Sequence, residues 1–228
     1  MKLIIQDIVK NFKEVSVLQG ATEEFESGII HGLIGRNGAG KTTLFNIIYH
    51  ELQADSGQVL IDEDGVVKPL ERKDVGMLFS EPLLPDFVTG YEFIKFFSEA
   101  QQKEVAIDLM FDEFELSEQD RHRLMKDYSH GMKNKVMLMM LFIQQPKVIL
   151  LDEPLTSLDI VVASQMKQWL RKLKREHILL LSTHVLDLAR DLCDRIVFLH
   201  HGVLRELDPA KLHQPDFENS LIEALSDV

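Results

Sequence analysis

A glycine-rich segment gives the clearest chemical signal in the sequence. Residues 35–42 read Gly-Arg-Asn-Gly-Ala-Gly-Lys-Thr; they follow an apolar run that ends at Ile34 and precede a helix-like run that begins near Thr43. This is the phosphate-binding loop pattern, in which glycines let successive backbone N–H groups point inward and the next helix adds positive partial charge. The alternative is a turn between a strand and a helix that binds nothing.

The side chains of this loop suit a nucleoside triphosphate bound with Mg²⁺. We expect Lys41 to contact the β- and γ-phosphates, Thr42 to offer its hydroxyl to Mg²⁺, and Thr43 to reach the α-phosphate. The residues expected to bind the phosphates are Asn37, Gly38, Ala39, Gly40, Lys41, Thr42 and Thr43.

Two adjacent carboxylates form a second candidate site. Asp152 and Glu153 end the apolar run 148–151, and the carboxyl end of a buried strand is where α/β sheets hold their ligands. We expect Asp152 to face Mg²⁺ through the metal's water shell and Glu153 to orient or deprotonate an attacking water. The alternative is a solvated strand end or a helix cap.

A parallel sheet would position both motifs. From Lys147 onward, short apolar runs alternate with amphipathic helices, which is typical of a parallel sheet flanked by helices. A helix-rich region is predicted over residues 91–143. The predicted strands are residues 2–9, 15–25, 29–34, 57–61, 75–79, 148–151, 178–181 and 196–199.

Composition excludes several classes of protein. A net charge of -12 over 228 residues argues against a nucleic-acid-binding surface, which needs clustered Lys and Arg. The single cysteine, Cys193, excludes an internal disulfide framework and is expected to be a small core residue. The longest apolar run, residues 136–143, is far shorter than the roughly 20 residues that cross a bilayer. We therefore expect no direct membrane insertion, and a cytosolic protein or one held at a membrane by a partner.

Three further motifs follow the phosphate loop. They are residues 128–132 (Tyr-Ser-His-Gly-Met), 157–159 (Ser-Leu-Asp) and 182–184 (Ser-Thr-His). Together with the phosphate loop and the acidic strand end, they make the chain similar to the nucleotide-binding subunit of an ATP-binding cassette (ABC) transporter. In that family these segments are the signature motif, the D-loop and the switch histidine.

The resemblance implies an α/β fold of the P-loop NTPase (RecA-like) type. The expected architecture is a parallel sheet core with an N-terminal antiparallel β subdomain and an inserted α-helical subdomain. The whole chain, 1–228, would be one ABC ATPase domain, with residues 1–80 and 134–228 as the nucleotide-binding core and residues 81–133 as the helical signature subdomain. The segment 209–228 is expected to form two short helices.

The resemblance also implies roles for individual residues. Two such domains would meet head to tail, so that Ser129 and Gly131 contact the γ-phosphate held by the opposite protomer, with Asp159 also at the nucleotide. His184 would hydrogen-bond the γ-phosphate, which makes Lys41, Glu153 and His184 the expected catalytic residues. Phe12 would stack on adenine, with Val17 closing the base pocket. Without the family, Ser129 is an ordinary helix N-cap, His184 a structural histidine and Phe12 a core residue.

The sequence departs from the family pattern at two places. Ser80 stands where most relatives carry a glutamine that contacts Mg²⁺ or the attacking water; Ser80, Thr42 and Asp152 are thus the expected metal-site residues. His130, Met132 and Lys133 make a signature variant most like that of the ATPases of ABC-2-type drug, antibiotic and polysaccharide exporters.

The expected function is an ATP-binding and ATP-hydrolysing subunit of an exporter. It would work as a head-to-tail dimer, expected to be a homodimer, at the cytoplasmic face of a membrane with separate integral permease subunits. One alternative is a soluble ABC-type ATPase that remodels a cytosolic assembly. Another is a nucleotide-binding module with slow or no turnover, which Ser80 favours.

Overall fold

Strands rich in branched and other apolar residues form two sheets of different kinds. The computed structural model describes residues 1–155 and 160–207. A four-stranded sheet has the order β2-β1-β4-β5 with antiparallel pairing, and a six-stranded sheet has the order β10-β9-β3-β8-β7-β6. Within the six-stranded sheet only the pairing of β10 with β9 is antiparallel. The strands are β1 (Lys2–Phe12), β2 (Val15–Glu26), β3 (Ile30–Ile34), β4 (Ser56–Glu63), β5 (Val66–Pro69), β6 (Val75–Leu78), β7 (Val148–Asp152), β8 (Ile178–Thr183), β9 (Arg195–His200) and β10 (Val203–Glu206).

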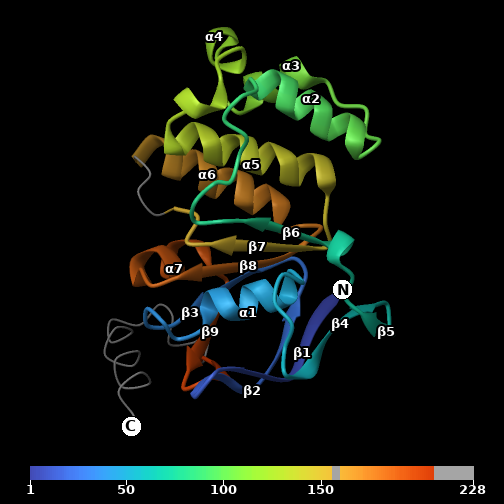
Figure 1. The fold of residues 1–228 in the computed structure, drawn as a ribbon, viewed down its shortest axis with the longest axis vertical. Coiled ribbons are helices and arrows are strands. Elements are labelled where there is room, and N and C mark those ends of the chain that lie inside the picture. The colour runs from blue at the N-terminus through green and yellow to red at the C-terminus, as the bar shows by residue number, and fades with distance from the viewer. Residues whose placement is uncertain (156–159, 208–228) are drawn as a thin grey trace.

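Helices cover both faces of the parallel sheet. Helix α1 lies between this sheet and the antiparallel strands, whereas α5 and α6 lie on the opposite face (Figure 1). Helices α2, α3 and α4 lie beyond α5, farthest from the antiparallel strands. The helices are α1 (Lys41–Ile48), α2 (Gly90–Ala100), α3 (Ile107–Glu113), α4 (Glu118–Arg121), α5 (His130–Gln144), α6 (Ile160–Leu173) and α7 (Leu186–Leu192), with short 3₁₀ turns at Arg72–Asp74 and Met125–Asp127.

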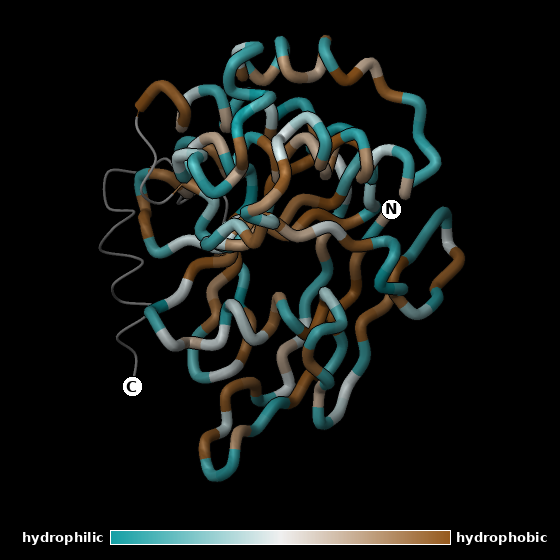
Figure 2. Tube along the Cα trace, turned by 45° about the horizontal axis from the view of Figure 1, so that its top comes forward, coloured by the Kyte–Doolittle hydropathy of each residue, from teal (hydrophilic) through white to brown (hydrophobic). Residues whose placement is uncertain are grey.

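Alternate residues of the central strands enter two different cores. In β7, Val148 and Leu150 pack with α1, while Ile149 and Leu151 pack with α5 and α6. Successive strand side chains point to opposite faces, so a strand covered on both sides must be apolar throughout. The tube in Figure 2 shows such hydrophobic stretches in the interior strands. This double burial fixes the strands whose carboxyl ends carry the candidate chemistry.

The predicted α/β class, with a parallel core, N-terminal antiparallel strands and a helical segment, is confirmed. Strands β5 and β10 were not predicted, because β5 is exposed throughout and ends at Pro69, and β10 is a four-residue edge strand. Helices α2 to α4 fall within residues 81–133, but the division of the domain at those limits stays a prediction. The helices expected in 209–228 and the D-loop 157–159 lie outside the described residues.

Two composition-based expectations concern the interior and the membrane. Cys193 is buried, and burial raises the pKa of its thiol to about 12. A side chain at Gly32 would meet its Sγ at 2.8 Å, so Cys193 fills a small space in the core as expected. Within residues 1–155 and 160–207, no helix combines the length and apolarity needed to cross a bilayer.

Candidate active site

The glycine-rich loop joins β3 to α1. Helix α1 begins at Lys41 rather than near Thr43, so Lys41 and Thr42 belong to its first turn, where backbone N–H groups have no intrahelical partner. Gly40 caps the helix with φ of 104°, and a Cβ there would lie 2.8 Å from Cγ1 of Val17. Only glycine avoids both the left-handed strain and this clash.

The ammonium group of Lys41 lies across its own loop. Lys41 is only 7% exposed, and its Nζ donates to the carbonyl oxygen of Gly35 at 2.8 Å and to that of Arg36 at 3.4 Å. Both acceptors are neutral, so phosphate oxygens would be stronger partners for the same charge.

The carboxylate of Asp152 is buried and held at both oxygens. Thr42 Oγ1 donates to Oδ2 at 3.0 Å, and Ser182 Oγ donates to Oδ1 at 2.5 Å. With 5% exposure, Asp152 is not a solvated strand end. Thr42 and Asp152, which are 110 positions apart in the sequence, are thus hydrogen-bonded at the carboxyl end of β7, where the metal site was expected.

Glu153 leaves β7 in an unusual backbone conformation. Its φ is +51°, which lies in the left-handed region. A residue with a side chain is strained in this conformation, and such residues are enriched at functional sites. Its N–H donates to both the carbonyl oxygen and Oγ of Ser182, each at 3.2 Å. Its Oε1 lies 2.9 Å from Nδ1 of His184, the residue that follows β8. A carboxylate and an imidazole therefore face each other beside the phosphate loop.

One cavity of about 380 Å³ gathers most of the predicted site residues. Phe12 is 46% exposed at its edge, with Lys10 Nζ 5.5 Å from the ring centroid, so Phe12 is not the core residue that the sequence also allowed. The cavity is lined by Phe12, Val17, Asn37, Gly38, Gly40, Lys41, Thr42, Thr43, Ser80, Asp152 and Glu153.

The oxygen donors in this cavity fit Mg²⁺. Thr42 and Asp152 already lie within hydrogen-bond distance of each other, and Ser80 lines the same space. Within the described residues, no group of three or more His, Cys, Asp and Glu side chains gathers around a metal-sized space. Hard oxygen ligands suit Mg²⁺, which keeps waters and phosphate oxygens in its remaining positions.

Four of the predicted residues that the structure describes do not line this cavity: Ala39, Ser129, Gly131 and His184. Ser129 caps α5 by accepting from the N–H of Met132 at 3.2 Å, and Gly131 lies in the first turn of that helix. Neither residue lines the cavity, and α5 starts on the far side of the parallel sheet from α1 (Figure 1). Asp159 lies outside the described residues.

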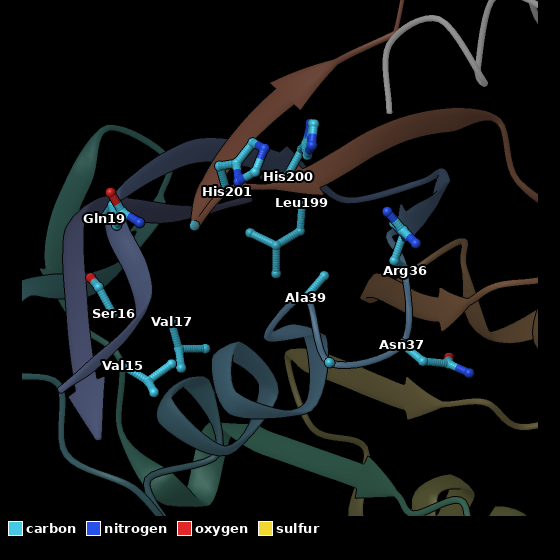
Figure 3. Close-up of a pocket in the computed structure, with 12 residues that line it drawn as sticks. Val15, Ser16, Val17, Gln19, Arg36, Asn37, Ala39, Leu199, His200 and His201 are labelled. Atoms are coloured by element: carbon cyan, nitrogen blue, oxygen red, sulfur yellow. The ribbon is translucent and has the colours of Figure 1, made fainter. Parts of the chain in front are cut away.

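A second cavity, of about 420 Å³, lies on the other side of the phosphate loop. Arg36, Asn37 and Ala39 border it from the loop, and it is also bordered by His200, the last residue of β9, and by His201 in the turn that follows (Figure 3). The two imidazole rings stack with centroids 4.0 Å apart. The lining of this cavity includes neither Asp152 nor Glu153, whereas both line the first cavity.

Two contributors to the site were missed by sequence reasoning. In the sequence Ser182 stands only as a neighbour of His184 in the Ser-Thr-His motif, and its bond to Asp152 depends on the pairing of β7 with β8. Asp55 binds Lys10 Nζ at 2.8 Å and the N–H of Asn11 at 2.7 Å, which braces the chain just before Phe12. No local sequence signal marks either residue, because both act across the fold.

Comparisons with known proteins agree with this geometry. The sequence profile of the family described as ABC transporter matches residues 18–156. The ABC transporter ATP-binding protein NatA of Bacillus subtilis is 31% identical over 199 residues, which are 83% of this chain and 80% of that protein. The sulfate/thiosulfate import ATP-binding protein CysA 1 of Chromobacterium violaceum is 30% identical over 226 residues, 93% of this chain and 63% of that protein.

Solved structures share the fold over nearly the whole chain. A structure of the ATP binding subunit of an ABC transporter has a TM-score of 0.83 and 25% identity, covering 98% of this chain and 99% of that chain. A dimeric ATP-binding cassette in a post-hydrolysis state, bound to ADP and Pi, has a TM-score of 0.77 and 22% identity, covering 91% and 98%. The P-loop NTPase fold is thereby confirmed, and the chain belongs to the ABC transporter family as an ATP-binding, ATP-hydrolysing subunit.

Proposed function

We propose that this chain hydrolyses Mg²⁺-bound ATP in a head-to-tail homodimer that drives export through separate membrane-spanning subunits. The observation that carries the chemical part is that Thr42, Asp152 and Glu153 line one cavity, where Thr42 bonds Asp152 and Glu153 bonds His184.

Each side chain has a distinct task in this proposal. Lys41 would exchange its carbonyl partners for β- and γ-phosphate oxygens. Thr42 and Asp152, with Ser80 nearby, would hold Mg²⁺, which neutralises charge on the phosphates. Glu153 would accept the hydrogen bond of the attacking water, orient it and take up its proton, and phosphoryl transfer needs little more than such positioning. Phe12 would stack on the base, with Val17 beside it.

The position of Ser129 and Gly131 supports the dimer. Ser129 and Gly131 lie at the start of α5, outside the cavity, so in this proposal they complete the site of a second copy of the chain. Helix N-termini suit phosphate oxygens because their N–H groups are free to donate. A related fold has been solved as a dimer with ADP and Pi.

A groove offers a place for the membrane-spanning partner. It has a volume of about 320 Å³ and is lined by residues of α2, α5 and β6, among them Phe97, Met140 and Met77. Leu83, which is 76% exposed, borders it just after Ser80. A helix or loop of the partner seated here would contact both the strand that leads to the active site and the helical region. Movement between these parts would thus reach the partner.

The proposal of export rests on the signature variant at residues 129–133. Because one named relative is an import protein, the direction is tested by transport into or out of vesicles that hold the purified complex. The subunit would lie at the cytoplasmic face of the membrane, held by its partner.

The test of the catalytic cycle is the Glu153→Gln variant. We expect ATP to double its molar mass in light scattering while phosphate release is lost, because the amide cannot accept the water's proton. The matched control is Glu118→Gln, an exposed change on α4, which should turn over as the wild type does. A Glu153→Gln protein that stays monomeric with ATP, or keeps full turnover, contradicts the proposal.

The partner is tested by affinity purification of Glu153→Gln in mild detergent with ATP. Recovery of a multi-span membrane protein supports transport. Recovery of soluble proteins alone favours the remodelling ATPase instead.

A further inference from the structure

Ser182 is a buried hydroxyl that joins the two acidic residues of the site. It is 0% exposed in β8 and pairs with Asp152 across the parallel β7–β8 ladder. Its Oγ lies 2.5 Å from Oδ1 of Asp152 and 3.2 Å from the backbone nitrogen of Glu153. It does not line the nucleotide cavity, so it acts through its neighbours.

The directions of these hydrogen bonds follow from the chemistry of the groups. A serine hydroxyl has one hydrogen to donate and lone pairs to accept, whereas a carboxylate only accepts and a backbone N–H only donates. Ser182 therefore donates to Asp152 and accepts from Glu153. One hydroxyl is satisfied on both sides and aligns the two residues relative to each other.

This arrangement sets which oxygen of Asp152 faces Thr42. Oδ1 accepts from Ser182 and Oδ2 accepts from Thr42 Oγ1 at 3.0 Å, so rotation of the carboxylate would break both bonds. Thr42 donates its only hydroxyl hydrogen to Asp152, so the lone pairs of Oγ1 remain available to coordinate a cation. The two expected Mg²⁺ ligands, Thr42 and Asp152, are thus pre-organised through Ser182.

We propose that Ser182 is a positioning residue for the Mg²⁺ site, and that metal affinity depends on its hydroxyl. The inference rests on the proposed function, since it requires Mg²⁺ at Thr42 and Asp152. Removing the hydroxyl leaves Glu153 N–H bonded to the carbonyl oxygen of Ser182, so the effect falls mainly on Asp152. Loss of such a supporting bond typically weakens metal binding by about tenfold or more.

The experiment measures binding of the non-hydrolysable analogue AMP-PNP by calorimetry, first in EDTA and then across a MgCl₂ titration. The variants are Ser182→Ala, which removes the donor, and Ser182→Thr, which keeps a hydroxyl on a side chain that strands favour. Ser182→Cys keeps nearly the same volume with a weaker donor and serves where the alanine variant does not fold. Ser98→Ala is the matched control, because it deletes a buried hydroxyl that bonds Lys103 in the helical region.

Mg²⁺ should raise the affinity for AMP-PNP, and we expect Ser182→Ala to need about tenfold more Mg²⁺ than the wild type to reach half of that increase. Binding of AMP-PNP in EDTA should be unchanged. Ser182→Thr and Ser98→Ala should match the wild type, and the ATPase assay should show the same shift in Mg²⁺ dependence. An unshifted Mg²⁺ titration for Ser182→Ala overturns the inference, and so does an equal loss of binding with and without Mg²⁺. A wild-type protein that binds the analogue without any Mg²⁺ dependence overturns the proposed function itself, and the inference with it.

Discussion

Nδ1 of His184 lies 2.9 Å from Oε1 of Glu153, although 31 positions separate the two residues in the sequence. They leave neighbouring parallel strands, β8 and β7, at the same edge of the sheet. Because a carboxylate only accepts, Nδ1 carries the hydrogen of this bond. Nε2 is then the ring nitrogen left for a second partner, and the pair forms one unit beside the phosphate loop.

Replacing His184 by alanine should lower turnover without abolishing ATP binding. In the proposed cycle Nδ1 orients Glu153 and Nε2 is left for the γ-phosphate, and a positioned group of this kind contributes about 100-fold or more to the rate. Phosphate release and calorimetric ATP binding measure the two effects separately. His122→Ala, an exposed histidine near Tyr91, is the control. Full turnover of His184→Ala would remove His184 from the catalytic residues.

A methyl group at Gly40 should destroy the phosphate site. Gly40→Ala combines strain at a φ of 104° with a Cβ 2.8 Å from Val17, and left-handed strain alone costs about 1–3 kcal/mol. We expect a lower melting temperature together with loss of ATP binding.

Gly65→Ala separates strain from clash. Gly65 has a φ of +86° in the β4–β5 hairpin, and a Cβ there meets nothing within 4 Å. This variant should lose stability and still bind ATP. If Gly40→Ala binds ATP as tightly as Gly65→Ala does, the close packing of the loop against Val17 is unimportant for the site.

The phosphate loop and the acidic strand end could be predicted because their signals are local. Glycines and Lys41 lie within eight consecutive residues, and Asp152 directly follows an apolar strand. The exposure of Phe12 was implied only by the family resemblance, because an aromatic residue near a strand end is, from the sequence alone, almost as well suited to the core. The bond between Ser182 and Asp152 depends on the register of two strands that are far apart in the sequence. Pairing of this kind follows from the packing of the whole sheet.

Charge in the groove beside Ser80 should separate the subunit from its membrane partner. Leu83→Asp places a carboxylate on an exposed apolar side chain that borders the groove, so an apolar partner surface would have to desolvate it. We expect less membrane protein in the affinity purification and an unchanged ATPase rate for the isolated subunit. Leu109→Asp, at a 69% exposed leucine of α3 outside the groove, is the control. Equal recovery with both variants would place the partner elsewhere.

Acid should destabilise the fold through His31. Burial lowers the pKa of this imidazole. Its Nε2 donates to the carbonyl oxygen of Glu26 at 2.8 Å, and Nδ1 has no hydrogen-bond partner among the described residues. The unfolded chain takes up this proton near pH 6.5, whereas the folded chain does so only at lower pH. Stability should therefore fall as the pH drops below about 6.5.

Melting temperatures between about pH 7.5 and pH 5 measure this effect, which lies in the range where histidines titrate. His31→Leu should show a flatter dependence than the wild type. His200, whose pKa is also lowered by burial, adds a slope of the same sign, so His31→Leu should flatten the curve without removing its slope entirely. Carboxylates such as Glu63, with a pKa of about 2, titrate below this range. If the melting temperature of His31→Leu falls with pH as steeply as that of the wild type, the prediction is contradicted.

The left-handed backbone of Glu153 has an evolutionary consequence. A φ of +51° suits glycine or asparagine better than glutamate, and the mismatch costs about 1 kcal/mol or more. Selection for folding stability alone would thus replace this residue, whereas under the proposed function selection for ATP turnover would retain it. In descendants of this chain that have lost ATPase activity, position 153 is therefore expected to change early, toward residues such as glycine or asparagine that remove the backbone strain.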